Sequence, residues 1–456
     1  MIIRNLIYIL QSESYNLRRF FSFVYNDYKW WKLEQRQKID WTTKVKLIYT
    51  ATLLFLLLLI IILFFIWHFW SLLLWPIIYI LLPLIISLIF LVIYPLDYLA
   101  KVLLVNKAKK IIKNYASLEV VGITGSYGKT SVKEILFTIL SSKFKAIETP
   151  DNINTDLGIA RFIINNREEL AKVDFFIVEM GAYQKGDIAK ACNLVAPDYS
   201  ILTGINDSHL ERFGSLDNTI FAKFELAEHT KKLSVLNFND ENIKNNHNRF
   251  KINEMIGLDI ATVSNIEALA NFSGLSFVFK GQRFTTKLLA KHNIDLIVLA
   301  LTLANRLGVN NDEAVKTIAQ LEYVKHRLQP IFNNSSQVLV IDDSYNGNFQ
   351  GFVSGLEVLS RSTGRKLIIT PGLVELGDST ESRHRQIANL YIEHKIDLVL
   401  LIKNSSTKFI IDEFQKKGFT NYKVYMSTKE AHNNFKDLLK AGDTIVFQND
   451  WPDNYK

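Results

Sequence analysis

The chain has 456 residues, of which 48% are hydrophobic and 21% are charged, and its 53 Lys and Arg against 45 Asp and Glu give a formal net charge of +8. Its single cysteine, Cys192, excludes a disulfide framework and any zinc site built from several cysteines. The length exceeds that of one ordinary domain, so we expect two or three.

The first feature along the chain is residues 47–96, a run of 50 mostly apolar residues without Asp, Glu, Lys or Arg. No element of a soluble core is that long, whereas a membrane-spanning helix needs about 20 residues. Polar residues and a proline within 68–76 indicate a turn, so we predict helices over 47–67 and 75–96. A re-entrant hairpin that does not cross the bilayer is the alternative.

Both flanks of this run are basic. Residues 1–46 hold nine Lys or Arg against four Asp or Glu, and residues 97–113 hold five against one. Cytoplasmic flanks of membrane spans are enriched in Lys and Arg, so we expect a multi-pass protein of the cytoplasmic membrane with the remainder of the chain in the cytoplasm. Residues 1–46 form either a helix on the bilayer surface or a loosely ordered tail. Nucleic acid is not expected as a partner, because the excess charge flanks the apolar run.

From residue 116 onward, short β-branched runs alternate with helical periodicity, which is typical of an α/β fold with a mostly parallel sheet. Helices with an apolar face are predicted at 130–141 and 293–307. Residues 232–290 are predicted to be β-rich and peripheral. Strands are predicted at 119–124, 174–179, 199–203, 338–342, 366–370, 397–402 and 444–447.

A fresh α/β unit is expected to begin near Arg327–Pro330, which completes the predicted domain organisation. The predicted parts are a basic N-terminal segment (1–46), a two-helix transmembrane hairpin (47–96), a basic linker (97–115), a P-loop central domain with a mostly parallel sheet (116–327) and a C-terminal Rossmann-like α/β domain (328–456).

Residues 122–131 carry the strongest chemical signal. They read Gly-Ile-Thr-Gly-Ser-Tyr-Gly-Lys-Thr-Ser and lie between a predicted strand and a predicted helix. Glycines let the backbone approach phosphate oxygens, and a helix N-terminus offers free N–H groups. Lys129 supplies a positive charge, and the Thr130 hydroxyl is placed to bind the Mg²⁺ that accompanies a nucleotide. The loop is a variant of the general template, and a chance glycine-rich turn is the alternative.

Weaker signals follow along the chain. Glu179 ends a predicted strand, where α/β sheets bind ligands, and could hold Mg²⁺ opposite the loop. His209 is a candidate metal ligand or a surface histidine, and Lys223 would ordinarily be solvated. Asn293 either caps a helix or contacts a ligand. Residues 342–348, Asp-Asp-Ser-Tyr-Asn-Gly-Asn, suit ribose, base or metal contacts, or form a tight turn.

In their combination and order, these motifs resemble those of the Mur ligase family, the ATP-dependent amide ligases of peptidoglycan precursor synthesis. The resemblance covers about 116–456. It rests on Thr-Gly-x-x-Gly-Lys-Thr, Glu-Met-Gly, His-Leu-Glu-x-Phe-Gly-Ser, Ala-Lys-x-Glu, His-Asn, Asp-Asp-Ser-Tyr-Asn and Glu-Leu-Gly. The family's N-terminal domain, which holds a uridine nucleotide sugar, is missing, and the predicted hairpin occupies its place.

The resemblance implies roles for individual residues. It implies that Lys129 contacts the ATP phosphates and that Thr130 and Glu179 bind one Mg²⁺. It also implies that His209 and a carbamylated Lys223 serve a second Mg²⁺, so that Lys129, Glu179, His209 and Lys223 are the catalytic residues. The implied nucleotide-binding residues are Gly125, Ser126, Gly128, Lys129, Thr130, Ser131, Asn293, Arg327, Asp343 and Asn346.

The implied reaction activates a carboxylate as an acyl phosphate and joins it to the amine of an amino acid or dipeptide. The expected amine is D-alanyl-D-alanine, and the expected acceptor is a small-molecule or lipid-linked peptide-bearing substrate. One alternative is a membrane-anchored ligase that acts on a different, lipid-linked carboxylate. Another is a catalytically silent, nucleotide-binding scaffold of the cell wall.

Overall fold

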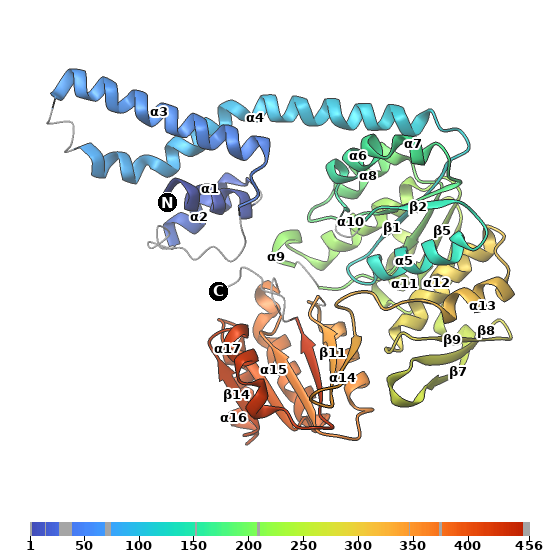
Figure 1. Cartoon of the computed structure of the whole chain (residues 1–456). Helices are drawn as coiled ribbons and strands as arrows, with labels where there is room; N and C mark the ends of the chain where they lie inside the picture. The colour runs from blue at the N-terminus through green and yellow to red at the C-terminus, as the bar shows by residue number, and fades with distance from the viewer. Residues whose placement is uncertain are drawn as a thin grey trace. The chain divides into compact units, whose positions relative to one another are not determined.

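The computed structural model describes residues 2–13, 15–26, 39–68, 74–150, 153–207, 210–345, 347–373 and 376–449 (Figure 1). The chain forms two compact units, and the sequence passes from the first to the second between Leu104 and Val105. The first unit carries the apolar helices, and the second carries the α/β domains.

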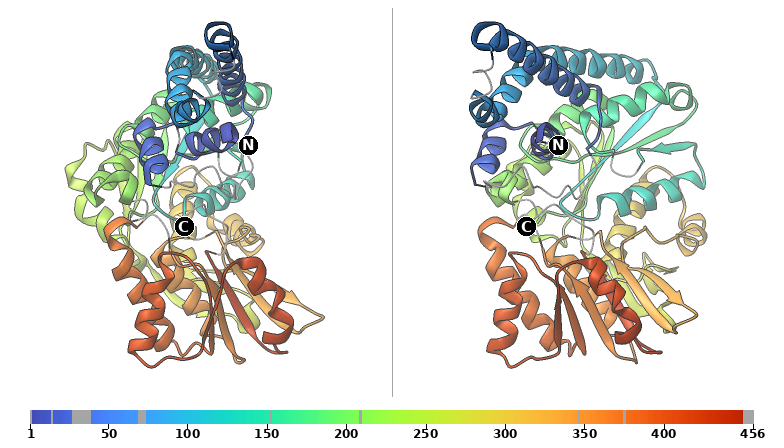
Figure 2. Two further views of the ribbon diagram at one scale, coloured as in Figure 1. Left: turned by 90° about the vertical axis from the view of Figure 1, so that its left-hand side faces the viewer. Right: turned by 60° about the vertical axis from the view of Figure 1, so that its left-hand side comes forward.

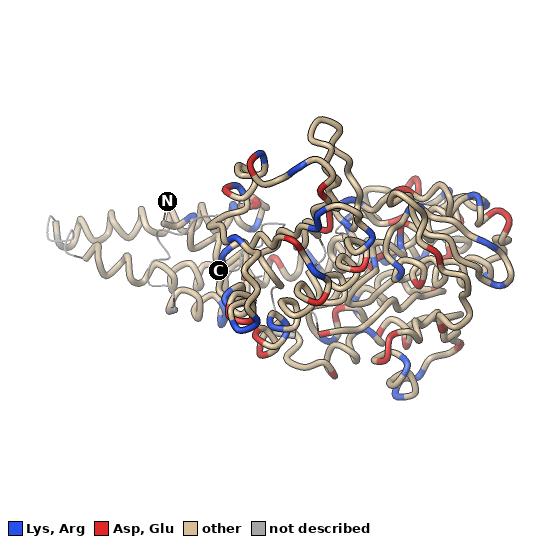
Figure 3. The backbone as a smooth tube through the Cα atoms, turned by 90° about the horizontal axis from the view of Figure 1, so that it is seen from below, with Lys and Arg blue, Asp and Glu red and all other residues tan. Residues whose placement is uncertain are grey.

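The first unit is helical. Its helices are α1 (Ile2–Ser12), α2 (Leu17–Asn26), α3 (Thr43–Trp67) and the first part of α4 (Trp75–Lys113). By length and composition, α3 and α4 could each cross a membrane. Only 11% and 28% of the residues in their most apolar stretches are buried, unlike those of a helix in a soluble core. Figure 3 shows these stretches without charged residues.

Helix α4 extends beyond the predicted second span. It continues through Pro83 and Pro95 to Lys113, so most of the predicted basic linker is helical. Lysine is a good helix former, and lysines in a last turn lie at the negative end of the helix dipole. The charge pattern therefore located the end of the apolar stretch but not the end of the helix. Asp97 pairs with Lys44 of α3 at 3.0 Å and with Lys101 at 2.8 Å, which joins the two helices at their charged end.

The second unit begins with a six-stranded, fully parallel sheet in the order β2-β3-β1-β4-β5-β6. The strands are β1 (Glu119–Thr124), β2 (Ala146–Glu148), β3 (Phe175–Glu179), β4 (Tyr199–Leu202), β5 (Leu233–Asn237) and β6 (Met255–Leu258). The inner strands are buried along their length, as in sheets that helices cover on both faces. The strands predicted in this region are confirmed.

Helices cover both faces of this sheet. On one face lie α5 (Lys129–Ser141), α12 (His292–Arg306) and α13 (Asn311–Ala319), which share a core with the strands. On the other lie α6 (Asp156–Asn165), α8 (Asp187–Val195) and α10 (Leu216–His229). Shorter helices are α7 (Arg167–Leu170), α9 (Leu210–Phe213) and α11 (Glu241–Asn246).

A three-stranded antiparallel sheet precedes α12. Its strands are β7 (Val263–Ala268), β8 (Leu275–Phe279) and β9 (Gln282–Thr286). The predicted β-rich segment 232–290 is therefore confirmed, although β5 and β6 within it belong to the parallel sheet. Short 3-10 helices lie at His247–Arg249, Ile260–Thr262, Ala270–Phe272 and Gly377–Ser379.

The C-terminal domain is built on a second six-stranded sheet, in the order β10-β11-β15-β12-β13-β14. The strands are β10 (Gln329–Asn333), β11 (Val338–Asp343), β12 (Lys366–Thr370), β13 (Leu398–Ile402), β14 (Tyr422–Tyr425) and β15 (Thr444–Gln448). β10 is an antiparallel edge strand that the sequence pattern did not predict, and the other pairs are parallel.

Helices again lie on both faces of this sheet (Figure 2). One face packs against α14 (Phe349–Leu359), α15 (Thr380–Glu393) and α16 (Thr407–Lys416). The other packs against α17 (Thr428–Asn433) and α18 (Phe435–Leu438). The predicted α/β class of both domains is thus confirmed.

Candidate active site

The loop between β1 and α5 is shaped by two glycines. Gly128 precedes α5 with φ of 75°, a left-handed conformation that favours glycine. A Cβ on Gly128 would lie 2.8 Å from Cδ2 of Leu296, and a Cβ on Gly125 would lie 2.1 Å from Oγ1 of Thr203. At these two positions the loop therefore exposes backbone without a side chain. The loop leads directly into the N-terminus of α5, and a helix N-terminus favours an anion.

The residues that follow the loop meet the end of β3. Thr130 Oγ1 donates a hydrogen bond to Oε2 of Glu179 at 2.9 Å, and Asn154 Nδ2 donates to Oε1 at 3.1 Å. Lys129 Nζ folds back onto the carbonyl of Gly125 at 2.9 Å. A carboxylate and a hydroxyl in contact fit one Mg²⁺, because this ion takes one or two protein oxygens and completes its shell with phosphate and water.

Charges at this point are arranged for an anion. Burial lowers the pKa of Lys129, and the charge of Arg327 lowers it further. Burial opposes ionisation of Glu179, but Lys129 and the hydrogen bonds from Asn154 and Thr130 outweigh that effect and lower its pKa. Several cations therefore gather around a single charged carboxylate, which favours a phosphate-bearing ligand.

Lys223 lies on α10 and is 3% exposed. Burial, followed by the charge of Lys129, lowers its pKa to about 7. Two residues further on, Glu225 accepts hydrogen bonds from the backbone N–H groups of Gly186 (2.5 Å) and Ala189 (2.9 Å) at the start of α8. The Ala-Lys-x-Glu motif therefore joins a buried, readily neutralised amine to a carboxylate that fixes the neighbouring helix.

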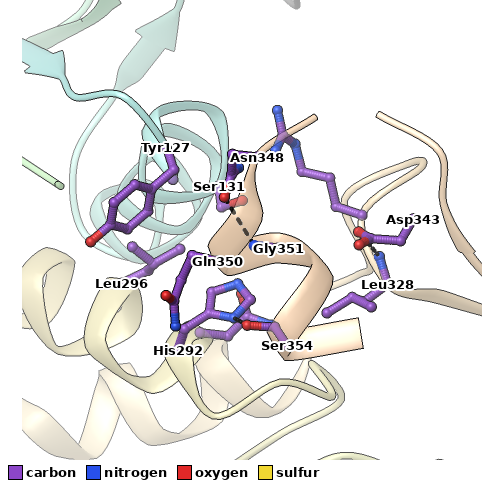
Figure 4. Close-up of a pocket in the computed structure, with 13 residues that line it drawn as sticks. Tyr127, Ser131, His292, Leu296, Leu328, Asp343, Asn348, Gln350, Gly351 and Ser354 are labelled. Atoms are coloured by element: carbon purple, nitrogen blue, oxygen red, sulfur yellow. Dashed lines mark hydrogen bonds between the residues drawn. The ribbon is translucent and has the colours of Figure 1, made fainter. Parts of the chain in front are cut away.

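A pocket with about 480 Å³ of empty space, including the part open to solvent, lies beside the loop (Figure 4). The central domain contributes Tyr127, Gly128, Ser131, His292, Asn293 and Leu296. The C-terminal domain and the connection to it contribute Arg327, Leu328, Asp343, Asn348, Gln350, Gly351 and Ser354.

Among the described residues, two of the hydrogen bonds that link the domains lie next to this pocket. His292 Nδ1 lies 2.9 Å from Ser354 Oγ (Figure 4), and Arg361 Nη1 donates to the carbonyl of Leu289 at 2.8 Å. Burial lowers the pKa of His292 to about 4, so this histidine is neutral near pH 7. Leu289 belongs to the hydrophobic core of the C-terminal domain. This end of the domain interface is therefore apolar and tightly packed.

The structure brings most of the predicted site residues together. Gly125, Ser126 and Gly128 form the loop, and Lys129, Thr130 and Glu179 converge beside it. Ser131, Asn293, Arg327 and Asp343 line the pocket. His209 and Asn346 lie outside the described residues.

One detail differs from the alternatives raised by the sequence, and a second adds a role to a predicted residue. Asn293 does not cap its helix, because α12 begins at His292 after Lys291. Asp343 is fully buried, and its Oδ1 accepts a hydrogen bond from the backbone N–H of Leu328 at 3.1 Å. It therefore helps to hold the connection between the domains as well as lining the pocket.

Sequence reasoning missed several residues of the site. Asn154 holds Glu179, and Tyr127 Oη donates to Oδ2 of Asp240 at 2.9 Å. Ser354 meets His292 across the domain interface. For Asn154 the only available signal was its position between β2 and α6, on the same edge of the sheet as the end of β3. The other contacts join distant parts of the sequence, so no local pattern indicated them.

Two family models match the chain. Residues 123–304 match the Mur ligase middle domain, and residues 326–448 match the Mur ligase glutamate ligase domain, so together they span more than half of the chain. The chain belongs to the Mur ligase family. As a Mur ligase it is an ATP-dependent ligase, and the first 122 residues lie outside both models.

Two curated relatives of this Mur ligase share one name. The UDP-N-acetylmuramoyl-tripeptide–D-alanyl-D-alanine ligase of Bacillus subtilis is 24% identical over 347 residues, which is 72% of each chain. The enzyme of the same name from Escherichia coli is 27% identical over 307 residues, which is 65% of this chain and 67% of the relative.

Solved structures agree with this fold. The MurF ligase of Thermotoga maritima in complex with ADP superposes with a TM-score of 0.66 and 26% identity, covering 76% of this chain and 80% of that one. MurF from Acinetobacter baumannii gives a TM-score of 0.67 at 24% identity, covering 76% and 77%. The family membership and the recognised fold confirm the resemblance seen in the sequence.

Proposed function

We propose that this Mur ligase uses ATP to join a carboxylate of a peptidoglycan precursor to the amine of D-alanyl-D-alanine. The names of the relatives support this amine and this class of acceptor. The observation that carries the proposal is the contact between Thr130 and Glu179 beside a glycine loop and Lys129, next to a pocket that both domains line.

The proposed reaction has two steps. An oxygen of the acceptor carboxylate attacks the γ-phosphorus of ATP, and the bond to the β–γ bridging oxygen breaks to give an acyl phosphate and ADP. The amine then attacks the acyl carbon, phosphate leaves, and the amine gives up a proton as the amide forms. Such phosphoryl transfer depends mainly on positioning and on charge stabilisation.

This chain's residues have assigned parts in the proposal. The loop amides and Lys129 hold the phosphates, and Arg327 adds positive charge from the connection between the domains. Mg²⁺ neutralises charge on the phosphates when it is bound, and Thr130 and Glu179 are the residues that would hold it. Asn293 is proposed to face the adenine, and Asp343 the ribose.

We also propose that Lys223 is carbamylated and that it joins His209 at a second Mg²⁺. Carbon dioxide reacts with a neutral amine, and a pKa of about 7 leaves a large neutral fraction at physiological pH. The product carries a negative charge, which suits a metal ligand. Supplying ¹³C-labelled bicarbonate and recording a carbamate signal that disappears in Lys223→Met tests this assignment.

The deciding experiment follows ADP release by the full chain with a tripeptide-bearing acceptor, with and without D-alanyl-D-alanine. We expect release only when both are present, and loss of release in Lys129→Ala. Binding of ATP without amine-dependent release would instead favour a catalytically silent scaffold.

A second candidate acceptor is a lipid-linked carboxylate at the cytoplasmic membrane. Two exposed, apolar helices precede the ligase domains and motivate it. On this proposal α3 and α4 span the bilayer with both ends in the cytoplasm. Mass spectrometry of products formed from matched acceptors with and without a lipid carrier distinguishes the two candidates.

A further inference from the structure

Residues 203–207, which follow β4, contact both the C-terminal domain and the loop between β1 and α5. That loop, residues 125–128, is called the phosphate loop below. At one end of residues 203–207, the backbone N–H of Ser126 donates to the carbonyl of Gly204 at 2.7 Å, and the N–H of Asn206 donates to Ser126 Oγ at 3.3 Å. In the middle, Ile205 N–H donates to Oδ2 of Asp240 at 2.8 Å. Residues 203–206 are therefore held firmly against the phosphate loop.

The other end of residues 203–207 is bound by the C-terminal domain. Nε and Nη2 of Arg383, on α15, both donate to Oδ2 of Asp207, at 2.9 and 2.7 Å. The two side chains are 31% and 16% exposed, so the pair is partly shielded from water. The guanidinium also lies 4.6 Å from the ring centre of Phe349, the first residue of α14.

The start of α14 is part of the nucleotide pocket, because Asn348, Gln350 and Gly351 line it (Figure 4). A continuous set of contacts thus runs from the phosphate loop through Asp207 and Arg383 to the opposite wall of the pocket. The apolar contacts around Leu289 close the interface elsewhere. The Asp207–Arg383 ion pair is therefore a polar contact between the domains, whereas the contacts around Leu289 are part of a hydrophobic core.

We infer that the Asp207–Arg383 pair is a positioning element that holds the α14 wall of the nucleotide pocket against the phosphate loop. The kinetic part of this inference rests on the proposed ATP-dependent ligation, whereas its binding part does not. Neither residue need touch a reacting atom. Without the pair, a smaller fraction of molecules has both walls of the pocket in place. The apparent nucleotide affinity is proportional to that fraction and therefore falls with it.

The test uses the full chain in nanodiscs and the variants Arg383→Gln, Asp207→Asn and the charge-swapped D207R/R383D. Affinity for a non-hydrolysable ATP analogue with Mg²⁺ is measured in each. A partly buried pair with two charge-assisted hydrogen bonds to one carboxylate oxygen predicts a loss of about five- to tenfold in either single variant. The swapped pair should recover affinity to within about threefold of the unmodified chain.

Arg385→Gln is the matched control. Arg385 lies on the same helix and pairs within the C-terminal domain, with Glu381 at 2.7 Å and Glu413 at 3.3 Å. Its loss perturbs α15 without touching the domain interface, so the affinity should not change. Spin labels at Lys172→Cys and Lys417→Cys, both exposed positions, report the distance between the domains. That distance should shorten with the analogue in the control but not in Arg383→Gln.

In turnover, a positioning role raises the KM for ATP more than it lowers kcat, whereas simple destabilisation lowers kcat through loss of folded enzyme. The inference is overturned if the affinity of D207R/R383D falls by as much as the losses of the two single variants combined. It is also overturned if Arg383→Gln and Arg385→Gln have the same affinity for the analogue. If the unmodified chain shows no D-alanyl-D-alanine-dependent turnover while binding and distance still follow the pair, the proposed function fails and this inference stands.

Discussion

The hydroxyl of Thr130 donates a hydrogen bond to the carboxylate of Glu179 across 2.9 Å, although the two residues lie 49 positions apart in the sequence. The contact forms because β1 and β3 are parallel neighbours, with Ile123 opposite Glu179. The end of β3 is thereby placed beside the start of α5. This pairing is the geometric basis for the first prediction.

Glu179→Gln should lower turnover by about 100-fold, since it removes the charge that would hold Mg²⁺ while keeping the shape of the side chain. Phosphate release at saturating ATP over a series of Mg²⁺ concentrations measures the effect. Glu168→Gln is the control, because that side chain is 84% exposed. An unchanged Mg²⁺ dependence in Glu179→Gln would contradict the assignment.

Lys223→Met should abolish turnover and yet stabilise the fold. The pKa of Lys223 is about 7 in the folded protein, against an ordinary value of 10.5, so the unfolded state binds more protons between these values. The destabilisation is complete below about pH 7 and is relieved as the pH rises toward 10.5. Removing the amine should therefore add up to about 5 kcal/mol at pH 6, and less at pH 9.

Thermal unfolding in carbon dioxide-free buffer at pH 6 and pH 9 checks this prediction, with the exposed Lys172→Met as control. A gain of the same size at both pH values would show that packing, rather than the buried charge, is responsible.

Gly128→Ala and Gly186→Ala distinguish two reasons for a glycine, which are a positive φ and the space that a missing side chain leaves for a ligand. Both residues have positive φ, 75° and 89°, so each substitution should cost about 1–2 kcal/mol of stability. A Cβ on Gly186 meets nothing within 4 Å, whereas one on Gly128 would press on Leu296 in the pocket wall. Only Gly128→Ala should weaken binding of an ATP analogue, which calorimetry can measure. Equal weakening in both variants would be inconsistent with the phosphate-loop assignment.

Cysteine labelling tests the proposed membrane topology. The native Cys192 is buried, and burial raises the pKa of its thiol, so background labelling should be low. His68→Cys lies directly after α3, and Lys109→Cys lies near the end of α4. In spheroplasts, an impermeant maleimide should label position 68 directly and position 109 only after permeabilisation. Labelling of both positions from outside would exclude the proposed orientation.

The elements that sequence analysis predicted well are those with local causes. The apolar runs of β1, β3 and β12 and the glycine loop depend on neighbouring residues, and their predicted bounds agree with the structure within one residue. The end of α4 was misjudged because charged residues begin where the apolar stretch ends, whereas helix propensity does not change there. β10 was missed because its residues alternate weakly and include Pro330.

The unpredicted part of the site consists of contacts across long sequence separations. His292 and Ser354 are 62 residues apart, and Asp207 and Arg383 are 176 apart. An arginine within a helix looks like any solvated arginine until the tertiary fold supplies its partner. The roles of these four residues can therefore be recognised only in the folded domains, and no sequence motif indicates them.

The proposed nucleotide pocket has walls from two domains, which has a consequence for inhibitor discovery. Gly128 and Asn293 come from one domain, whereas Arg327, Asn348 and Gly351 come from the other domain and the connection to it. A fragment screen on residues 116–326 alone would present only the central-domain half of this pocket, without Arg327, Asn348 and Gly351. Compounds selected against the full chain would contact both domains at once. They would block turnover by keeping the two domains together as well as by displacing ATP.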